Sequence, residues 1–207
     1  MTGLNRNAKV GRGRPLYRDQ LDKDRLEARN GILQYRLVRR LADQSIGVLS
    51  VTPDIIKSLH REAIKGVHSC AGQYRTWGVR LGSSHKPPES RYVSGLVEEM
   101  CSRANGGTEW DPIQVAAYLL WRLNWIHPFG GGNGRTSRAL AELSLRIGLD
   151  HTLPGKPTLT EQIVDNREAY IGALKDADAA WSVDVLNFGQ MERLLTRLLE
   201  ERLERFG

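Results

Sequence analysis

Apolar residues recur at helical spacing through most of this 207-residue chain. Between Leu21 and Leu41 they stand mostly three, four or seven positions apart, which places them on one face of a long amphipathic helix. Thr52 and Pro53 then supply a cap and a first-turn proline for a second helix, which runs through Ile64. This opening pattern predicts helices that pack through one apolar face.

Later parts of the chain repeat these signals. Proline marks the starts of two more helices, and glycines separate neighbouring helices. The remaining predicted helices cover residues 87–101, 111–126, 139–147, 159–174 and 183–203. The helix that ends at Ile126 is apolar on nearly every side, so we expect it to be buried.

Only one stretch of the sequence has strand character. Residues 77–81 alternate large apolar side chains with Gly and Arg, and residues 82–88 are rich in turn-forming Gly, Ser and Pro. We therefore expect a short β-hairpin or extended flap at this point. The predicted fold class is all-α, a helical bundle with a short β-hairpin flap before the helices on either side of residues 127–134, which carry the candidate site.

The composition suits one soluble domain. A 207-residue chain with 40% hydrophobic residues can bury one sizeable core, which we place in residues 21–207. Residues 1–20 combine basic residues with Gly, Asn and Pro, which predicts a flexible basic arm. The arm has no apolar stretch, so it predicts neither a secretion signal nor a membrane span, and two unpaired-looking cysteines fit a reducing compartment. A cytoplasmic location is the expectation.

The net charge of +6 and the pI near 9.5 raise nucleic acid as a partner, because phosphates attract Lys and Arg. Outside the arm, however, the basic residues alternate with Asp and Glu along predicted helices and are not strongly clustered. Nucleic acid is therefore the less favoured partner.

The chemistry concentrates between residues 127 and 138, which read His-Pro-Phe-Gly-Gly-Gly-Asn-Gly-Arg-Thr-Ser-Arg. Pro128 disfavours helical backbone at His127, so the chain should turn there and hold the imidazole at the end of a buried helix. A histidine titrates near neutral pH and can act as a general base. We therefore treat His127 as the candidate catalytic residue.

The glycine-rich loop that follows His127 has the composition of an anion site. Its glycines let backbone N–H groups converge on one point, and the start of the next helix adds its positive dipole end. Arg135 and Arg138 stand three residues apart on that helix, where two guanidinium groups can grip a polyphosphate. The candidate phosphate-binding residues are Gly130, Gly131, Gly132, Asn133, Gly134, Arg135 and Arg138.

With these residues the chain resembles the Fic (Fido) family, whose signature is His-Pro-Phe-x-Asp/Glu-Gly-Asn-Gly-Arg-x-x-Arg. Every fixed position matches except the acidic one, which is Gly131 here. The segment Ala71-Gly-Gln-Tyr-Arg75 and the flap also resemble the family's approach to its target-docking hairpin. The resemblance covers residues 48–174, the expected motif core.

The resemblance implies a protein adenylyltransferase that moves AMP from ATP onto a Ser, Thr or Tyr hydroxyl. His127 would take the hydroxyl proton, the loop would hold the α-phosphate, and the two arginines would bind the β- and γ-phosphates of the leaving group. The target protein would dock on residues 79–88 by strand addition. A toxin-like modifier, acting in its own cell or delivered to another, is the family-level expectation.

Gly131 opens alternatives, because in the family the acid at this position holds the Mg²⁺ that bridges the phosphates. The expectation is that no protein residue ligates a metal and that Mg²⁺, carried mainly by ATP, is held only weakly. The chain could keep AMP transfer, use a different phosphate donor, or bind a nucleotide without transferring any part of it. AMP transfer ranks first because the base, the loop and both arginines are present.

Two further expectations concern regulation and the other histidines. The family's inhibitory pattern, Ser/Thr-x-x-x-Glu-Gly/Asn, has only partial matches, such as Thr196 with Glu200, so the chain is expected to be uninhibited in cis or restrained by a partner chain. His60, His68 and His151 lack ligand-type neighbours at metal spacing and are expected on the surface or in loops.

Overall fold

A computed structural model describes residues 13–45, 48, 50–81, 85–106, 110–149 and 153–205. Its regular structure is helical, and the described residues include no β-strand beyond one isolated bridge between Pro15 and His68. The helices are α1 (Gln20–Gln44), α2 (Pro53–Ile64), the short 3₁₀ helix η1 (Ser90–Tyr92), α3 (Val93–Asn105), α4 (Pro112–Ile126), α5 (Asn133–Gly148), α6 (Leu159–Asp165), α7 (Arg167–Trp181) and α8 (Gly189–Glu204). The all-α prediction is confirmed.

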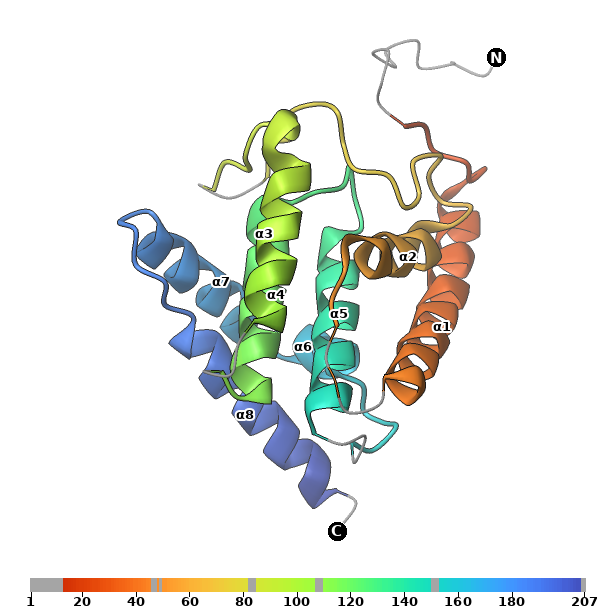
Figure 1. Cartoon of the computed structure of the whole chain (residues 1–207). Coiled ribbons are helices and arrows are strands. Elements are labelled where there is room, and N and C mark those ends of the chain that lie inside the picture. Colours follow the sequence, from red (N-terminus) through yellow and green to blue (C-terminus); the bar gives the residue numbers. More distant parts are fainter. Residues whose placement is uncertain are drawn as a thin grey trace.

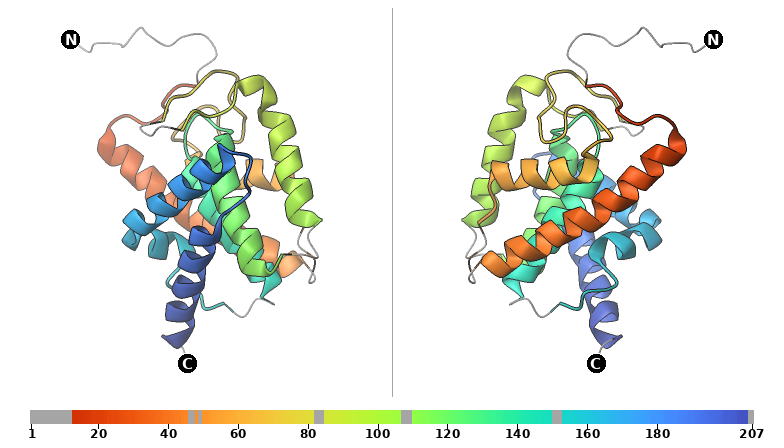
Figure 2. Two further views of the ribbon diagram at one scale, coloured as in Figure 1. Left: turned by 90° about the vertical axis from the view of Figure 1, so that its left-hand side faces the viewer. Right: turned by 90° about the vertical axis from the view of Figure 1, so that its right-hand side faces the viewer.

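The pair α4 and α5 forms the centre of the bundle (Figure 1). Helices α1 and α2 pack together against α5, whereas α3 and α8 pack on α4. Turned views show α1 crossing one side of the central pair and α6, α7 and α8 gathered on the other (Figure 2). Because α4 and α5 touch most of the other helices, their junction at residues 127–132 is fixed by the whole bundle.

The N-terminus of α4 forms as the sequence predicts. Asp111 accepts hydrogen bonds from the backbone N–H groups of Ile113 and Gln114, while the Gln114 side chain accepts one from the Asp111 N–H. Ten of the residues between Val115 and Ile126 are buried, so the helix is the core of the domain. Thr52 likewise caps α2, as expected.

Three predicted helix boundaries are wrong. The helix expected from residue 87 begins only at Ser90, because residues 87 and 88 are drawn out to place the Pro88 carbonyl on the Arg75 guanidinium. The helix expected over 159–174 is broken at Asn166, whose side chain donates to the Gln162 carbonyl and ends α6. The last helix begins at Gly189, after a turn in which Asp184 has a positive φ.

The arm and the flap differ in part from expectation. Residues 1–12 and the flap tip, 82–84, lie outside the described residues. The Leu16 N–H donates to the Val67 carbonyl and the Arg14 carbonyl accepts from the Ser69 N–H, so this part of the expected flexible arm is held by main-chain bonding. The described flap residues, 77–81 and 85–88, have an irregular backbone without ladder pairing, so the hairpin is not shown.

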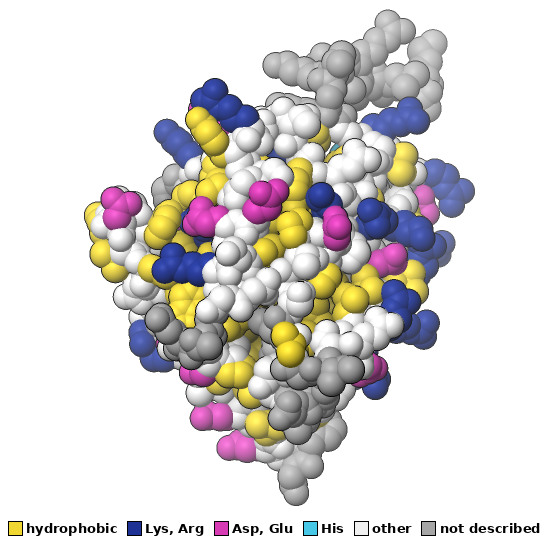
Figure 3. All heavy atoms as spheres, viewed as in Figure 1, with side chains coloured by type: hydrophobic (Ala, Val, Ile, Leu, Met, Phe, Trp, Pro, Cys, Tyr) yellow, Lys and Arg dark blue, Asp and Glu magenta, His cyan; other side chains and the backbone are white. Residues whose placement is uncertain are grey.

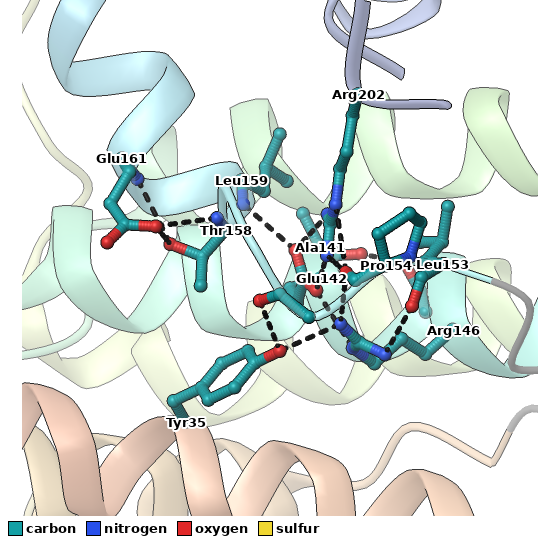
Figure 4. Close-up of polar contacts among 12 residues, drawn as sticks. Tyr35, Ala141, Glu142, Arg146, Leu153, Pro154, Thr158, Leu159, Glu161 and Arg202 are labelled. Atoms are coloured by element: carbon teal, nitrogen blue, oxygen red, sulfur yellow. Dashed lines mark hydrogen bonds and ion pairs between the residues drawn. The ribbon is translucent and has the colours of Figure 1, made fainter. Parts of the chain in front are cut away.

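A buried ion cluster joins the helices at the far end of α5 (Figure 4). Glu142 accepts hydrogen bonds from Arg146, from both terminal nitrogens of Arg202 and from the Leu159 backbone N–H, at 2.8 to 3.0 Å. Arg146 also donates to the Tyr35 hydroxyl at 2.9 Å. All of these charged groups are buried, so the cluster fixes α5, α6, α8 and α1 relative to one another.

Basic side chains gather over α1, at the right-hand edge of Figure 3. The outward face of α1 presents five exposed arginines, Arg25, Arg29, Arg36, Arg39 and Arg40. Positive charge is therefore more concentrated on this helix than alternation along the sequence indicated, because residues three, four and seven apart share a face.

Candidate active site

His127 ends α4 in a strained backbone conformation. Its φ and ψ of 51° and 57° lie in the left-handed region, and its N–H donates to the Leu123 carbonyl as the C-cap of the helix. The turn expected from Pro128 is thus confirmed. A non-glycine residue at positive φ persists only where its surroundings hold it, so the holding contacts matter.

Arg75 supplies those contacts. The guanidinium donates to the carbonyls of His127 at 2.8 Å, Ile126 at 3.3 Å, Pro88 at 2.6 Å and Trp77 at 3.0 Å. Its own backbone N–H donates to the Pro128 carbonyl at 2.9 Å. Arg75 is only 2% exposed, and it ties the end of α4 to both sides of the flap. No role for Arg75 follows from the sequence, because its contacts with the end of α4 join residues more than fifty positions apart.

The His127 imidazole is neutral at physiological pH. Burial lowers its pKa to about 4, and the nearby positive charges of Arg75 and His85 act in the same direction. Nδ1 lies 3.4 Å from the Asn124 carbonyl oxygen, which can only accept, so Nδ1 carries the proton of the neutral ring. Nε2 therefore keeps the lone pair that a general base needs.

Asn133 closes the loop on itself. Its Oδ1 accepts from the Phe129 N–H and its Nδ2 donates to the Phe129 carbonyl, both at 3.0 Å. Asn133 is 2% exposed, so both ends of the amide are used within the protein. The amide that was a candidate for phosphate binding is therefore bonded to the backbone of Phe129.

His60, on α2, is a loop-shaping residue that the sequence interpretation missed. It is fully buried and stacks on the Phe129 ring at a centroid distance of 3.6 Å. Nε2 donates to the Gly131 carbonyl at 2.9 Å, while Nδ1 accepts from the Gly72 N–H at 2.9 Å. The expectation of a surface or loop histidine is wrong here, whereas His151 lies outside the described residues. The spacing along α2 could have revealed that His60 is buried, because His60 lies one helical turn from both Ile56 and Ile64, on the same face of the helix.

The surroundings of Gly130 and Gly132 leave no room for a side chain, whereas those of Gly131 do. A Cβ on Gly130 would lie 2.6 Å from the Trp77 ring, and Gly132 combines a φ of +76° with a Cβ position 2.8 Å from Ile64. Gly131 is exposed, and a Cβ there would meet no atom within 4 Å. A larger side chain would therefore fit at position 131.

The start of α5 is arranged to receive an anion. No side chain of the described chain caps the helix at Gly132, so the first backbone N–H groups of this 16-residue helix have no capping acceptor. Arg138 lies alongside, with its Nη1 3.2 Å from the Cβ position of Gly134. Its Nε is buried without a hydrogen-bond partner. A phosphate oxygen would satisfy these donors together.

The two motif arginines have different partners. Arg135 forms an ion pair with Glu27 of α1 at 3.1 Å and donates to the Ala63 carbonyl at 3.1 Å. Arg138 forms no ion pair with any described carboxylate, and burial lowers its pKa, while the nearby Tyr170 acts in the opposite direction. Arg138 is thus a half-buried cation, with a buried Nε, that pairs with no carboxylate in the described chain.

A cavity of about 480 Å³ lies between the flap and α7, near His127. The indoles of Trp125 and Trp181 meet edge to face in its wall, and the His85 Nε2 lies 2.8 Å from the Trp125 carbonyl oxygen. Lys86, Lys175 and Asp178 also line the cavity. Its volume falls within the range of ordinary ligand pockets.

Comparison with known proteins places this arrangement in a family. Residues 50–145, which contain α2 to α4, the whole loop and most of α5, match the model of the Fic/DOC family. This segment is a Fic domain. Helix α1 and helices α6 to α8 lie outside the matched residues.

Curated relatives and solved structures agree with this assignment. Proteins named protein adenylyltransferase Fic from Nematostella vectensis and Drosophila persimilis are 35% and 32% identical over 101 and 133 residues, which is 44% and 62% of this chain. The chain spans only 22% and 26% of their lengths.

Fic-1 from C. elegans superimposes with a TM-score of 0.72 at 22% identity, over 88% of this chain and 51% of that one. A Fic-domain signaling protein from Bacteroides thetaiotaomicron gives 0.70 at 19% identity, over 88% and 70%. At these identities the structures show the Fic fold alone.

The Fic motif of this chain does not provide a protein-held Mg²⁺ site. Position 131, which is acidic in the family signature, has no side chain, and no described group of three His, Cys, Asp or Glu side chains could hold a metal. A hard cation needs oxygen ligands, and carboxylates are the usual protein contribution. The motif therefore lacks the usual carboxylate ligand, and weak retention of Mg²⁺ by the protein stays a prediction.

The Fic domain was also expected to have no membrane span. Among the described residues, no helix has both the length and the apolar content needed to cross a bilayer.

Proposed function

We propose that this chain is a protein adenylyltransferase that moves AMP from ATP onto a Ser, Thr or Tyr hydroxyl of a target protein. The observation that carries the proposal is the neutral imidazole of His127, with Nε2 available, beside the uncapped start of α5 and Arg138, which pairs with no described carboxylate. The name shared by the curated relatives supports the same activity. Because the chain covers about a quarter of those relatives, their activity is an inference for this protein.

In the proposed reaction, Nε2 of His127 takes the proton of the target hydroxyl as its oxygen attacks the α-phosphorus. The bond from that phosphorus to the β-phosphate oxygen breaks, and the products are an AMP ester of the target and pyrophosphate. Backbone N–H groups of the loop and of α5 stabilise the charge that develops on the α-phosphate. Arg138, with Arg135 beside it, would bind the pyrophosphate leaving group.

The cavity beside His127 is the proposed site of the nucleotide base. Its aromatic wall offers a surface for a purine, and that wall includes Trp125, two residues before His127 in the chain. Asp178 presents one carboxylate oxygen to the Trp121 indole N–H at 2.9 Å. The other oxygen is available to accept from an exocyclic amine.

The target is proposed to dock on residues 79–88. The described part of this segment has no strand partner, so its backbone groups can bond to an extended peptide in the manner of strand addition. Arg75 fixes both ends of the segment relative to His127, which would place the bound hydroxyl close to the base.

A second candidate function rests on Gly131. Without the motif acid, the domain could bind a nucleotide and transfer no part of it, or accept a different phosphate donor. Mg²⁺ would then come only with the nucleotide, and no step of the mechanism above depends on it.

Separate measurements of nucleotide binding and transfer distinguish the two functions. We expect His127→Ala to bind ATP as the wild type does and to lose transfer by about 10²- to 10⁴-fold, the usual contribution of a general base. Equal binding by both proteins without transfer by either would favour the binding module.

A further inference from the structure

Exposed arginines follow the outward face of α1 as a continuous stripe (Figure 3). At 3.6 residues per turn, they fall within an arc of roughly 100° around the helix. At 1.5 Å per residue, they extend over roughly 22 Å of its length. We call this surface the arginine stripe, and its members are Arg25, Arg29, Arg36, Arg39 and Arg40.

The carboxylates of α1 lie outside the stripe. Residues 28–42 contain no Asp or Glu. Glu27 lies on the other side of the helix, where it pairs with Arg135 at 3.1 Å. Asp22 and Asp43 lie beyond the two ends of the stripe. The positive charges in between are therefore not balanced by acids on the same face.

The guanidinium groups of the stripe have few partners within the protein. None of the five forms an ion pair with a carboxylate of the described residues. Arg29 donates to the amide oxygen of Asn30 at 3.3 Å, and Arg25 acts electrostatically on Asp22. Two pairs of these arginines stand four positions apart, where like charges repel each other on a helix. A bound anion would remove that repulsion.

The polarity of the stripe distinguishes between possible anionic partners. The apolar side of α1 is buried against α2 and α5, and the one large apolar side chain among the arginines is Ile32, which is 59% exposed. A helix that binds a membrane surface inserts an apolar face, and the core of a protein interface is depleted in charged residues. A row of backbone phosphates needs cations alone, so it fits this surface best.

The stripe also distinguishes between duplex and single-stranded nucleic acid. Single strands are held largely by aromatic side chains on which their bases stack. Tyr35, the aromatic residue of α1, is half-buried and donates its hydroxyl to the Gly155 carbonyl at 2.8 Å. A duplex presents its phosphates on the outside, and roughly 22 Å corresponds to about six base pairs at 3.4 Å each.

We propose that the arginine stripe binds the phosphate backbone of double-stranded nucleic acid without reading its sequence. The guanidinium groups would donate pairs of N–H bonds to phosphate oxygens. Charges that alternate with acids along the sequence are grouped on one face of the folded helix, and this grouping carries the proposal. Helix α1 lies outside the residues that match the Fic family, so the surface goes beyond the proposed transferase function and does not depend on it.

The test is fluorescence anisotropy of a labelled duplex of about 20 base pairs, titrated with the full chain at salt concentrations from about 50 to 200 mM. Duplex DNA and duplex RNA of the same sequence are separate arms, because both present the same phosphates. Five phosphate contacts predict a slope of log K against log salt of about −4.5, at −0.9 for each contact. The double variant Arg36→Gln, Arg40→Gln should lower that slope by about 1.8 and weaken binding on the order of tenfold.

The matched control is the double variant Arg167→Gln, Arg193→Gln. These two arginines are also exposed and form no ion pair with a described carboxylate, but they belong to α7 and α8, on the opposite side of the central helix pair (Figure 2). The control changes the net charge equally and should bind the duplex as the wild type does. Both variants keep the basic residues of positions 1–12, so any contribution from these residues cancels.

Four results would overturn the proposal, provided that circular dichroism shows each variant to be folded. They are failure of the wild type to bind either duplex, equal binding by the stripe variant, equal weakening by the control, and tighter binding to a single strand of the same sequence. Capture by phosphatidylserine vesicles without binding to either duplex would instead assign the stripe to a membrane surface.

Discussion

Acidification should destabilise the protein through His60. This histidine is fully buried between Gly72 and Gly131, and burial lowers its pKa from 6.5 to about 4. In the unfolded chain it protonates near pH 6.5, so between pH 6.5 and 4 the unfolded state binds the extra proton. The free energy of unfolding therefore falls as the pH falls through this window.

The magnitude follows from the two pKa values. Lowering the pH from 7 to 5 should remove about 2 kcal/mol of unfolding free energy through His60 alone. The structural reason is that protonation puts a second N–H on the ring, at Nδ1, where it faces the Gly72 N–H. His127, with a pKa also near 4, adds a similar loss.

The assay is urea unfolding of the wild type and of His60→Gln at pH 7 and pH 5. Glutamine does not titrate, so the variant should be less stable at pH 7 but should lose about 2 kcal/mol less than the wild type on going to pH 5. Carboxylates and His127 titrate in both proteins, so their effects cancel in the comparison. If both proteins lose the same amount, His60 is not the neutral buried group described above.

Three further outcomes are expected. Gly131→Glu should raise the affinity for Mg²⁺, measured by titration in the presence of ATP. The melting temperature should not fall, because the new side chain enters open space. A destabilised variant would contradict the loop geometry. Arg138→Ala should weaken ATP binding by about 1.5–3 kcal/mol in calorimetry. AMP binding should change less, because the guanidinium is proposed to bind the phosphates of the leaving group, which AMP lacks. Equal effects on both nucleotides would contradict that role of Arg138. Glu142→Ala should lower the free energy of unfolding, measured in urea, by about 3–5 kcal/mol, because it leaves Arg146 and Arg202 buried without their carboxylate. A loss below about 1 kcal/mol would show that the two arginines find other partners.

Local signals predicted the elements that carry the site. The Thr52 and Asp111 caps, the continuous apolar sequence of α4, and Pro128 after His127 act within a few residues, and the structure contains the corresponding helix starts and turn. The missed boundaries had weaker local signals. The break at Asn166 depends on one side chain that bonds to Gln162, and periodicity continues across it.

The contacts that complete the site join distant parts of the sequence. Arg75 reaches the end of α4, His60 reaches Gly131, and Glu27 pairs with Arg135 across 108 positions. No helical or strand period relates such residues, so they emerge only when the helices pack. The family resemblance identified the loop and its two arginines as candidate site residues. It did not identify the side chains that hold the loop and the arginines in place.

The central claim is transfer of AMP with His127 as the base, and the most direct measurement uses ATP labelled at the α- or at the γ-phosphate. Each is incubated with the protein and a cell lysate, and label bound to protein is counted for the wild type and His127→Ala. The account predicts label from α-labelled ATP only, and only with the wild type. Label from γ-labelled ATP, equal labelling by His127→Ala, or no labelling by a folded wild type that binds ATP would contradict it.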